Sequence, residues 1–503
     1  MERSSGEQGI AEGSNRCGRM ARMWSRDWVP WKVFRARQRE KARSPEAQST
    51  APSGHSDVGG DPQQRHPAEG PSSGHSSEPR PRPRAPSPAP APPAQLPDHA
   101  QAASPRKTIP KAHSLIDKVY RWDNLYSAWR RVRANKGAHG LDRVTVRSFE
   151  ADWEKHLHEI QRQLIQRRFE PLPVRRVYIP KASDPKKLRP LGIPTVADRI
   201  VQQAIVQIVD PLFDAYLSPR SFGFRKGRRA HDAIATAIQD AREGFRHVVD
   251  ADITAFFDRI DREVTMSCVR ERVADGRVLD LIEAFLKAGV SENGVVTVPT
   301  EGTPQGGVIS PWLSNLVLDR LDKAIESKGW RHVRYADDFV VLCRSRQEAE
   351  EALAYVKEVL GELKLSLHET KTRLSDFEEG FEFLGFHFRH YRLGIRAKSI
   401  ERFKERVRTL TQRQQGRNVE AVLEDLNPVI RGWSNYVGVA EATAKLAKLD
   451  CWIRMRVRAF RLQRKCRNDN WRLPNRRLEK WGLLSLQQCR PRYRLSYVCA
   501  LGP

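Results

Sequence analysis

Two adjacent aspartates stand between two apolar runs in residues 333–343, which read VRYADDFVVLC. Aspartate is uncommon in strands, and two half-buried neighbouring carboxylates repel each other and lose hydration. A hard divalent cation removes both costs, because Mg²⁺ binds through one or two carboxylates together with substrate phosphates. The segment therefore predicts a β-hairpin whose tip, at Asp337 and Asp338, holds metal for phosphoryl transfer.

A third carboxylate is expected from residues 248–253, which read VVDADI and predict a buried strand. Strand alternation places Asp250 and Asp252 on one face, so spacing alone does not choose between them. Together with Asp337 and Asp338, this strand would surround two ions roughly 4 Å apart. Such a pair activates a hydroxyl nucleophile and stabilises charge on the transferring phosphate.

Two further segments have the chemistry of a nucleotide site. Residues 301–311, EGTPQGGVISP, form a glycine-rich loop that opens a helix and allows close backbone approach. In it, Gln305 offers both a donor and an acceptor. Upstream, YIPK at 178–181 and KLRPLGIP at 187–194 predict a strand-turn-strand unit whose cations Lys181 and Arg189 suit a triphosphate.

Composition points to a polyanionic partner. The 503-residue chain has a formal net charge of +27 and a pI of about 10.1, which favours nucleic acid over the alternative of a membrane surface. No run of about 18 apolar residues predicts a membrane span, and no secretory signal is recognised. Seven scattered cysteines without a C-x-x-C pair suit reduced thiols in the cytoplasm.

The chain divides by composition. Residues 1–108 are rich in Pro, Ser and Arg and are predicted to be disordered. Beyond them, helices and strands interleave without a strict βαβ period, which predicts an α+β fold with a mixed or antiparallel sheet. We expect helices at 116–134, 149–168, 198–209, 310–327 (capped by Ser310-Pro311) and 347–363, and strands at 174–179, 247–253, 295–299 and 381–388.

The chain from residue 389 is the most basic part. It has 27 Lys and Arg residues and 9 Asp and Glu residues, a net charge of +18. Helices are predicted at 399–415, 419–437 and 444–465. The last combines aromatic residues with Arg454, Arg458, Arg461 and Lys465, which suits phosphate contacts with base stacking. A solvated basic helix face is the alternative.

A family resemblance rests on these motifs taken in order. Tyr335 to Asp338 matches the YxDD box of reverse transcriptases, and the larger set resembles the reverse transcriptases (maturases) encoded by group II introns. The resemblance covers about residue 111 to the end, through the boxes at 136–142, 189–194, 221–228, 252–253, 304–311, 335–338 and 383–386, with a maturase motif at 430–436.

The resemblance implies roles for single residues. Asp252, Asp337 and Asp338 match the aspartates that bind two Mg²⁺ ions (with Mn²⁺ as a substitute), which leaves Asp250 structural. Four further matches concern the nucleotide and the RNA. Lys181 and Arg189 would hold the dNTP phosphates, and Gln305 would contact the nucleotide. Phe257 (less well Phe256) would exclude a 2′-hydroxyl. Arg431 would contact RNA.

The resemblance also implies an architecture and a function. We expect a right-hand polymerase with fingers and palm at 109–388, a helical thumb and maturase domain at 389–468, and a basic DNA-binding tail at 469–503. It would bind its intron RNA to assist splicing and copy it by target-primed reverse transcription. Its partners would be RNA, target DNA, dNTPs and a second copy in a homodimer, in the cytoplasm of a bacterial-type cell and associated with the nucleoid.

Two alternatives to this function stay open. One is a domesticated polymerase of the same fold in host defence or DNA repair. The other is a splicing cofactor with an inactive polymerase, against which the three aspartates argue. Because no Cys/His endonuclease cluster follows, no DNA nicking is expected.

Overall fold

The computed structural model describes residues 111–180, 188–298, 302, 306–464 and 469–491. The extension predicted to be disordered lies outside these residues, and so do Lys181, Gln305 and Lys465. In the described ranges, no helix is long and apolar enough to cross a bilayer.

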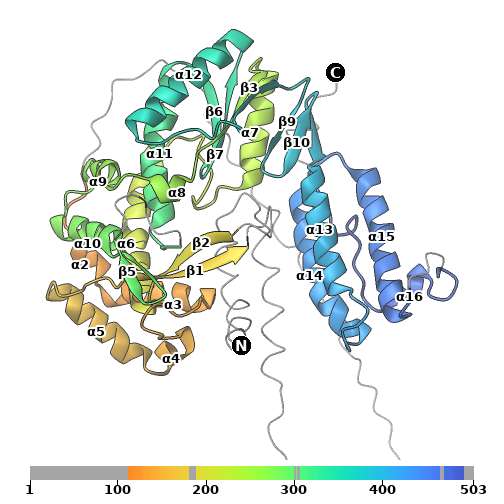
Figure 1. Cartoon of the computed structure of the whole chain (residues 1–503), viewed down its shortest axis with the longest axis horizontal. Helices are drawn as coiled ribbons and strands as arrows, with labels where there is room; N and C mark the ends of the chain where they lie inside the picture. The colour runs from red at the N-terminus through yellow and green to blue at the C-terminus, as the bar shows by residue number, and fades with distance from the viewer. Residues whose placement is uncertain (1–110, 181–187, 299–301, 303–305, 465–468, 492–503) are drawn as a thin grey trace, which may run out of the picture. The chain divides into compact units, whose positions relative to one another are not determined.

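A four-stranded sheet lies at the centre of the polymerase part (Figure 1). Its strands are β3 (His247–Asp252), β6 (Arg331–Tyr335), β7 (Asp338–Cys343) and β8 (Arg373–Asp376), in the order β6-β7-β3-β8. Every neighbouring pair is antiparallel. The prediction of an α+β fold is confirmed, and so is the acidic hairpin.

Both faces of this sheet are covered, which explains why β7 is apolar at every position after Asp338. Val249 and Val341 point into a core shared with α11 (Ser310–Ser327) and α12 (Arg346–Glu362). Val248 and Leu342 point into a second core with α7 (Ala230–Arg242). Alternate residues of one strand therefore serve two different cores.

A second sheet has the order β2-β1-β4-β5, with β1 (Val174–Pro180), β2 (Leu188–Ile193), β4 (Val290–Glu292) and β5 (Val295–Thr297). β1 and β2 pair antiparallel from Arg175 with Ile193 to Pro180 with Leu188, which confirms the two strands of the predicted unit. The turn between them lies outside the described residues. β1 also pairs in parallel with β4, so the fold as a whole contains both pairings.

Two predicted helices are each divided in the structure. Residues 116–134 form α2 (Ile116–Val119) and α3 (Trp122–Asn135), because Arg121 has an extended backbone with ψ 139°. Residues 149–168 form α4 (Val146–Ala151) and α5 (Trp153–Ile165). A capping box between Thr145 and Ser148 starts α4 earlier than predicted.

Two local predictions are wrong. Residues 381–388 are not one strand but the hairpin of β9 (Phe381–Phe383) and β10 (Phe386–Arg389), since Leu384 and Gly385 both have positive φ. The helix α11 is not capped by Ser310, because Ile309 is its N-cap and Ser310 already lies in the first turn.

The remaining helices described before β9 pack into the two cores defined above. The sequence analysis did not predict α7, α8 (Phe256–Arg259), α9 (Arg262–Arg270) or α10 (Gly276–Lys287). The predicted helix at 198–209 is longer, as α6 (Val196–Phe213), and a short 3-10 turn, η4 (Asp214–Tyr216), follows it.

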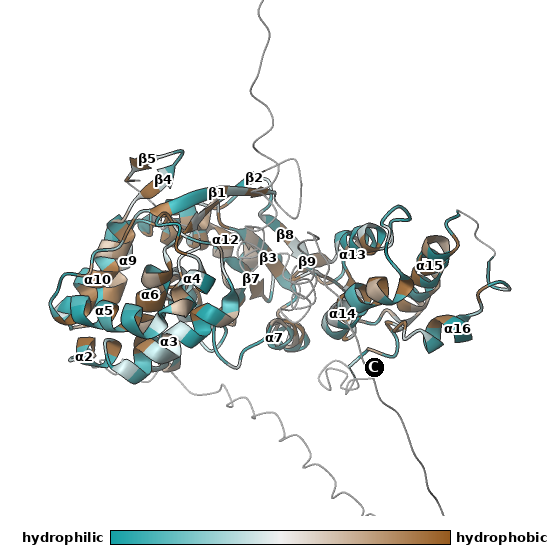
Figure 2. Cartoon of the chain, turned by 90° about the horizontal axis from the view of Figure 1, so that it is seen from below, coloured by the Kyte–Doolittle hydropathy of each residue, from teal (hydrophilic) through white to brown (hydrophobic). Residues whose placement is uncertain are grey.

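The chain beyond β11 (Arg392–Ile395), which pairs with β10, is helical as predicted. It forms α13 (Ala397–Leu410), α14 (Val419–Val437), α15 (Thr443–Arg461) and α16 (Asn475–Lys480). Apolar residues along these helices make a common core, visible as brown bands in Figure 2. Leu473, Leu478 and Leu486 join it, so the described part of the predicted tail packs on this helical domain.

Candidate active site and nucleic-acid surface

The hairpin tip brings two of the predicted metal ligands face to face. Tyr335 and Asp338 are the last paired residues of β6 and β7, so Ala336 and Asp337 form a two-residue turn. Across the sheet, Asp338 is the direct partner of Asp252 on β3. Both carboxylates are buried and lie on the same face, because directly opposed residues of antiparallel strands share a side.

The turn has a backbone conformation that its surroundings impose. Ala336 has a φ of 61°, which is uncommon for a residue with a side chain. Gly223 packs directly against it, since a Cβ at that glycine would lie 2.1 Å from the Ala336 nitrogen. The Gly223 carbonyl accepts a hydrogen bond from Asn315 Nδ2 at 3.0 Å.

A fully buried arginine holds the same turn from beneath. Arg334 donates from Nε and Nη2 to the two carboxylate oxygens of Asp322, at 2.7 and 2.6 Å. Its Nη1 donates to Asn315 Oδ1 and to the Ala336 carbonyl, both at 3.0 Å. The guanidinium therefore links helix α11 to the peptide that precedes Asp337.

The charge of Asp322 depends on this network. Burial alone would raise its pKa, but Arg334 and the neighbouring His332 together hold the pKa of Asp322 far below its usual range. The sequence analysis missed these residues. The one local signal was an arginine directly before the Tyr335–Asp338 motif, and its partners on α11 were not foreseeable from spacing.

The predicted metal ligands already contact cations of the chain. Lys371 Nζ lies 2.6 Å from Asp252 Oδ2, and its side chain is 54% exposed. Arg189 is partly buried, and this loss of hydration lowers its pKa, while Asp337 and Asp258 act on that pKa in the opposite direction. Arg189, which is predicted to bind the nucleotide, therefore lies near Asp337, which is predicted to bind metal.

The donor set suits Mg²⁺ chemically, because it consists of carboxylate oxygens from adjacent strands and the turn between them. Among the described residues, no three His, Cys, Asp or Glu side chains converge on a common point that could hold a metal ion. The carboxylates of Asp252, Asp337 and Asp338 therefore do not meet at one point among the described residues. Asp250 lies opposite Val340 and Arg373 and stands apart from the turn.

Of the residues predicted to bind the nucleotide, the structure describes Arg189 on β2 and Phe257 on α8, and described glycines of the glycine-rich loop approach both elements. Phe256 and Phe257 are both buried at the start of α8, with their rings edge to face at 5.2 Å. Gly302 lies against α8, since a Cβ there would be 2.6 Å from the Asp258 carbonyl. A Cβ at Gly306 would be 2.3 Å from the Gly192 carbonyl, so the glycine-rich loop approaches the strand that carries Arg189.

Comparison with known proteins identifies both parts of the chain. Residues 179–388 match the reverse transcriptase (RNA-dependent DNA polymerase) family, and residues 400–481 match the group II intron maturase-specific domain. Protein YkfC of Escherichia coli is 35% identical over 344 residues, which are 60% of this chain and 88% of YkfC. The chain belongs to the group II intron reverse transcriptases.

More distant relatives are consistent with this family. The group II intron-encoded protein LtrA of Lactococcus lactis is 29% identical over 359 residues, 57% of this chain and 59% of LtrA. A putative COX1/OXI3 intron 1 protein of Saccharomyces cerevisiae is 29% identical over 216 residues, 42% of this chain and 25% of that protein. This reverse transcriptase is an RNA-directed DNA polymerase with a maturase domain, in a family that uses divalent metal.

The maturase motif of this reverse transcriptase reaches the polymerase site. Tyr436 on α14 donates from its hydroxyl to the Leu384 carbonyl at 2.7 Å, and its own carbonyl lies 2.8 Å from His231 Nε2. Burial raises the pKa of Tyr436, and nearby Tyr335 and Asp338 raise it further. The second aromatic residue of the motif, Trp433, is buried in the helical core.

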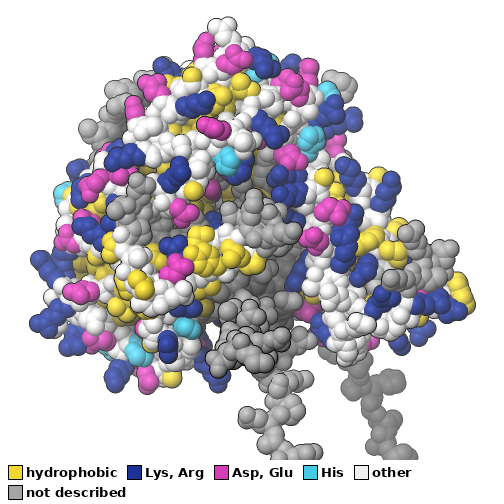
Figure 3. Space-filling model, viewed as in Figure 1, with side chains coloured by type: hydrophobic (Ala, Val, Ile, Leu, Met, Phe, Trp, Pro, Cys, Tyr) yellow, Lys and Arg dark blue, Asp and Glu magenta, His cyan; other side chains and the backbone are white. Residues whose placement is uncertain are grey.

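The predicted nucleic-acid contacts of the reverse transcriptase differ in exposure. Arg431 and Arg461 are exposed, and Arg454 is half-buried beside Cys451. Arg458 is buried and donates to the Leu473 carbonyl at 2.7 Å and to Asn475 Oδ1, so it holds the chain beyond α15. Lys and Arg side chains gather on the surface of the helical domain in Figure 3.

Proposed function

We propose that Asp252, Asp337 and Asp338 hold the two Mg²⁺ ions of this reverse transcriptase, with Mn²⁺ as a substitute. The observation that carries the proposal is the direct cross-strand pairing of Asp252 with Asp338, beside a turn that presents Asp337. When bound, the ions would supply an activated primer 3′-hydroxyl and stabilisation of charge on the transferring phosphate.

The chain's own cations have complementary tasks in this proposal. Lys371 neutralises Asp252 in the structure and is exposed enough to leave when metal binds. Arg189, placed near Asp337, would hold the phosphates of the incoming dNTP together with Lys181. Phe257 would close the space beside a 2′-hydroxyl, and Gln305 would contact the nucleotide.

We further propose that the maturase domain binds the intron RNA and assists its splicing, and that the polymerase copies this RNA from a primer in the target DNA. Exposed Arg431 and Arg461 on a domain of high net charge support RNA binding. The match to the maturase-specific domain favours this role over a domesticated polymerase. The homodimer, the basic DNA-binding tail and the nucleoid-associated location stay predictions.

Primer extension on an RNA template tests the metal assignment. Asp337→Asn is expected to lower the extension rate by at least about 100-fold, because a neutral amide replaces a metal-binding carboxylate. Asp250→Asn is the matched control on the same sheet and should extend at nearly the wild-type rate. Wild-type extension by Asp337→Asn, with RNA binding intact in both variants, would refute the assignment.

A further inference from the structure

One aromatic side chain is unusually exposed in this reverse transcriptase. Trp471 is 74% exposed, more than any other large apolar side chain of the described residues. A single exposed apolar residue needs no explanation by itself. Its anchoring and its surroundings are what distinguish this tryptophan.

The loop that carries Trp471 is fixed on both sides of it. Asp469 is 1% exposed and accepts a hydrogen bond from Arg464. Leu473 is 4% exposed, and its carbonyl accepts the hydrogen bond from buried Arg458. The Leu473 nitrogen also donates to the Asp469 carbonyl at 3.0 Å, which closes a turn around Trp471. The indole is therefore presented to solvent by an anchored turn.

The charge around this turn favours a polyanion. The Arg472 guanidinium lies 4.7 Å from the centre of the Trp471 ring. Arg476, Arg477 and Lys480 are exposed on the adjoining helix α16. Between residues 470 and 480 the sequence has four basic residues and one acidic residue. An aromatic face among cations is the combination that binds a stacked base and its phosphates.

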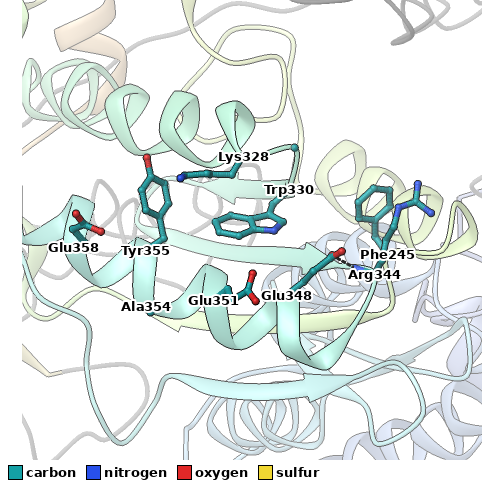
Figure 4. A pocket seen from close by; sticks show the side chains of 10 residues that line it. Phe245, Lys328, Trp330, Arg344, Glu348, Glu351, Ala354, Tyr355 and Glu358 are labelled. Carbon is teal, nitrogen blue, oxygen red and sulfur yellow. Dashed lines mark hydrogen bonds between the residues drawn. The ribbon is translucent and has the colours of Figure 1, made fainter.

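A second group of aromatic side chains, on the palm, has acidic rather than basic surroundings. A surface pocket of about 710 Å³ beside α12 contains Trp330 and Tyr355, with Lys328 Nζ 4.6 Å from the centre of the Tyr355 ring. Figure 4 shows carboxylate side chains around these rings, from Glu348, Glu351 and Glu358. Those carboxylates repel phosphates, so this ring and cation pair is unsuited to nucleic acid.

We propose that Trp471 stacks on an unpaired nucleobase while Arg472, Arg476 and Arg477 contact the flanking phosphates. The proposal rests on the proposed function, in which RNA and target DNA are the substrates. A single strand is required, because within a duplex the neighbouring base pairs already cover both faces of each base. A loop of intron RNA and a single-stranded stretch of target DNA share this chemistry.

Binding measurements with the full-length protein test the proposal. Labelled single strands of about twelve nucleotides, as RNA or DNA, are titrated while an excess of unlabelled primer–template fills the polymerase cleft. We expect Trp471→Ala to weaken binding about tenfold and Trp471→Phe much less, because a phenyl ring still stacks. Tyr355→Ala, which removes the ring of the acidic pocket, is the matched control and should bind like the wild type.

Salt dependence separates stacking from charge. Trp471→Ala should leave the slope of log affinity against log salt unchanged, since stacking releases no counterions. Replacing Arg476 and Arg477 by Gln should reduce that slope by about 1.4, which is two single-strand phosphate contacts. An effect of Trp471→Ala on RNA alone assigns the site to RNA, and an effect on DNA alone assigns it to target DNA.

Two results would overturn the proposal. One is unchanged affinity of Trp471→Ala for both strands, and the other is an equal loss of affinity for a blunt duplex.

Photocrosslinking is a second measurement. Strands that contain 5-iodouridine should crosslink to the peptide that contains Trp471, and crosslinks confined to other peptides would also contradict the proposal. Primer extension by Asp337→Asn tests the polymerase separately, so failure of the stacking site leaves the proposed function standing.

Discussion

The arginine beneath the palm hairpin and two arginines of the helical domain differ in exposure. In the palm, Arg334 is fully buried and gives every nitrogen to Asp322, Asn315 or the Ala336 carbonyl. In the helical domain, Arg431 and Arg461 are exposed. A buried guanidinium requires charge and hydrogen-bond compensation, whereas an exposed one keeps its hydration until a phosphate arrives. Buried Arg334 therefore positions the acidic turn, and an exposed arginine is available to a partner.

This difference has consequences for substitution. Removing one member of a buried ion pair leaves the other charge buried without compensation, so the free energy of unfolding should fall strongly. Removing an exposed cation should change affinity and its salt dependence but hardly change stability. The comparison can thus be tested by matched substitutions in the two regions.

The largest effect is expected at Arg334. Arg334→Met leaves the Asp322 carboxylate buried beside an apolar chain, so the free energy of unfolding should fall by about 3–5 kcal/mol. Urea denaturation measures this loss. Arg346→Met on α12 is the control, because Arg346 pairs with Glu350 at the surface and its loss should cost about 1 kcal/mol or less.

A double variant separates stability from positioning. Arg334→Met combined with Asp322→Leu replaces the buried pair by apolar residues and should recover most of the lost stability. Primer extension should stay impaired, because the Ala336 carbonyl still lacks its donor. Full recovery of extension would show that Arg334 serves folding alone.

The second effect concerns a buried carboxylate that is hydrogen-bonded by a threonine rather than by an arginine. Asp198 at the start of α6 receives hydrogen bonds from Thr195, and burial raises its pKa from 3.8 to about 6. Because the folded state binds the proton more tightly, this group destabilises the protein as pH rises from about 4 to about 6. Asp322 behaves in the opposite sense, because its pKa is lowered in the folded state. Its ionised carboxylate therefore stabilises the folded protein at pH values above the usual carboxyl pKa, and this stabilisation is lost as the pH falls below it.

Asp198→Asn should therefore remove a pH-dependent cost. Its free energy of unfolding relative to the wild type should rise by about 3 kcal/mol between pH 4 and pH 7, which is the equivalent of two pKa units. Unfolding by urea at several pH values measures this difference. A difference that is constant with pH would mean that Asp198 does not titrate in this range.

The sequence predicted those features that depend on neighbours along the chain. Alternation and two adjacent carboxylates were enough to predict the hairpin and β3. The structure adds that Asp252 on β3 lies directly opposite Asp338 on β7. The network beneath the turn was not predictable, because Asn315 and Asp322 reach Arg334 only through packing of α11. The burial of Arg458 was also hidden, since its acceptor Leu473 follows a loop. Periodicity identifies a basic helix but not which of its arginines turns inward.

The smallest effect on stability is expected at the exposed arginines, and it provides the strictest test of the comparison. Arg431→Gln should change the free energy of unfolding by less than about 0.5 kcal/mol. It should lower the slope of log RNA affinity against log salt by about 0.7–0.9, the value of one phosphate contact. Arg458→Gln lies in the same domain and should do the reverse, destabilising by about 1–3 kcal/mol through the lost Leu473 bond, with an unchanged salt slope. If the two variants instead changed stability and salt slope alike, exposure would not distinguish positioning arginines from binding arginines in this domain.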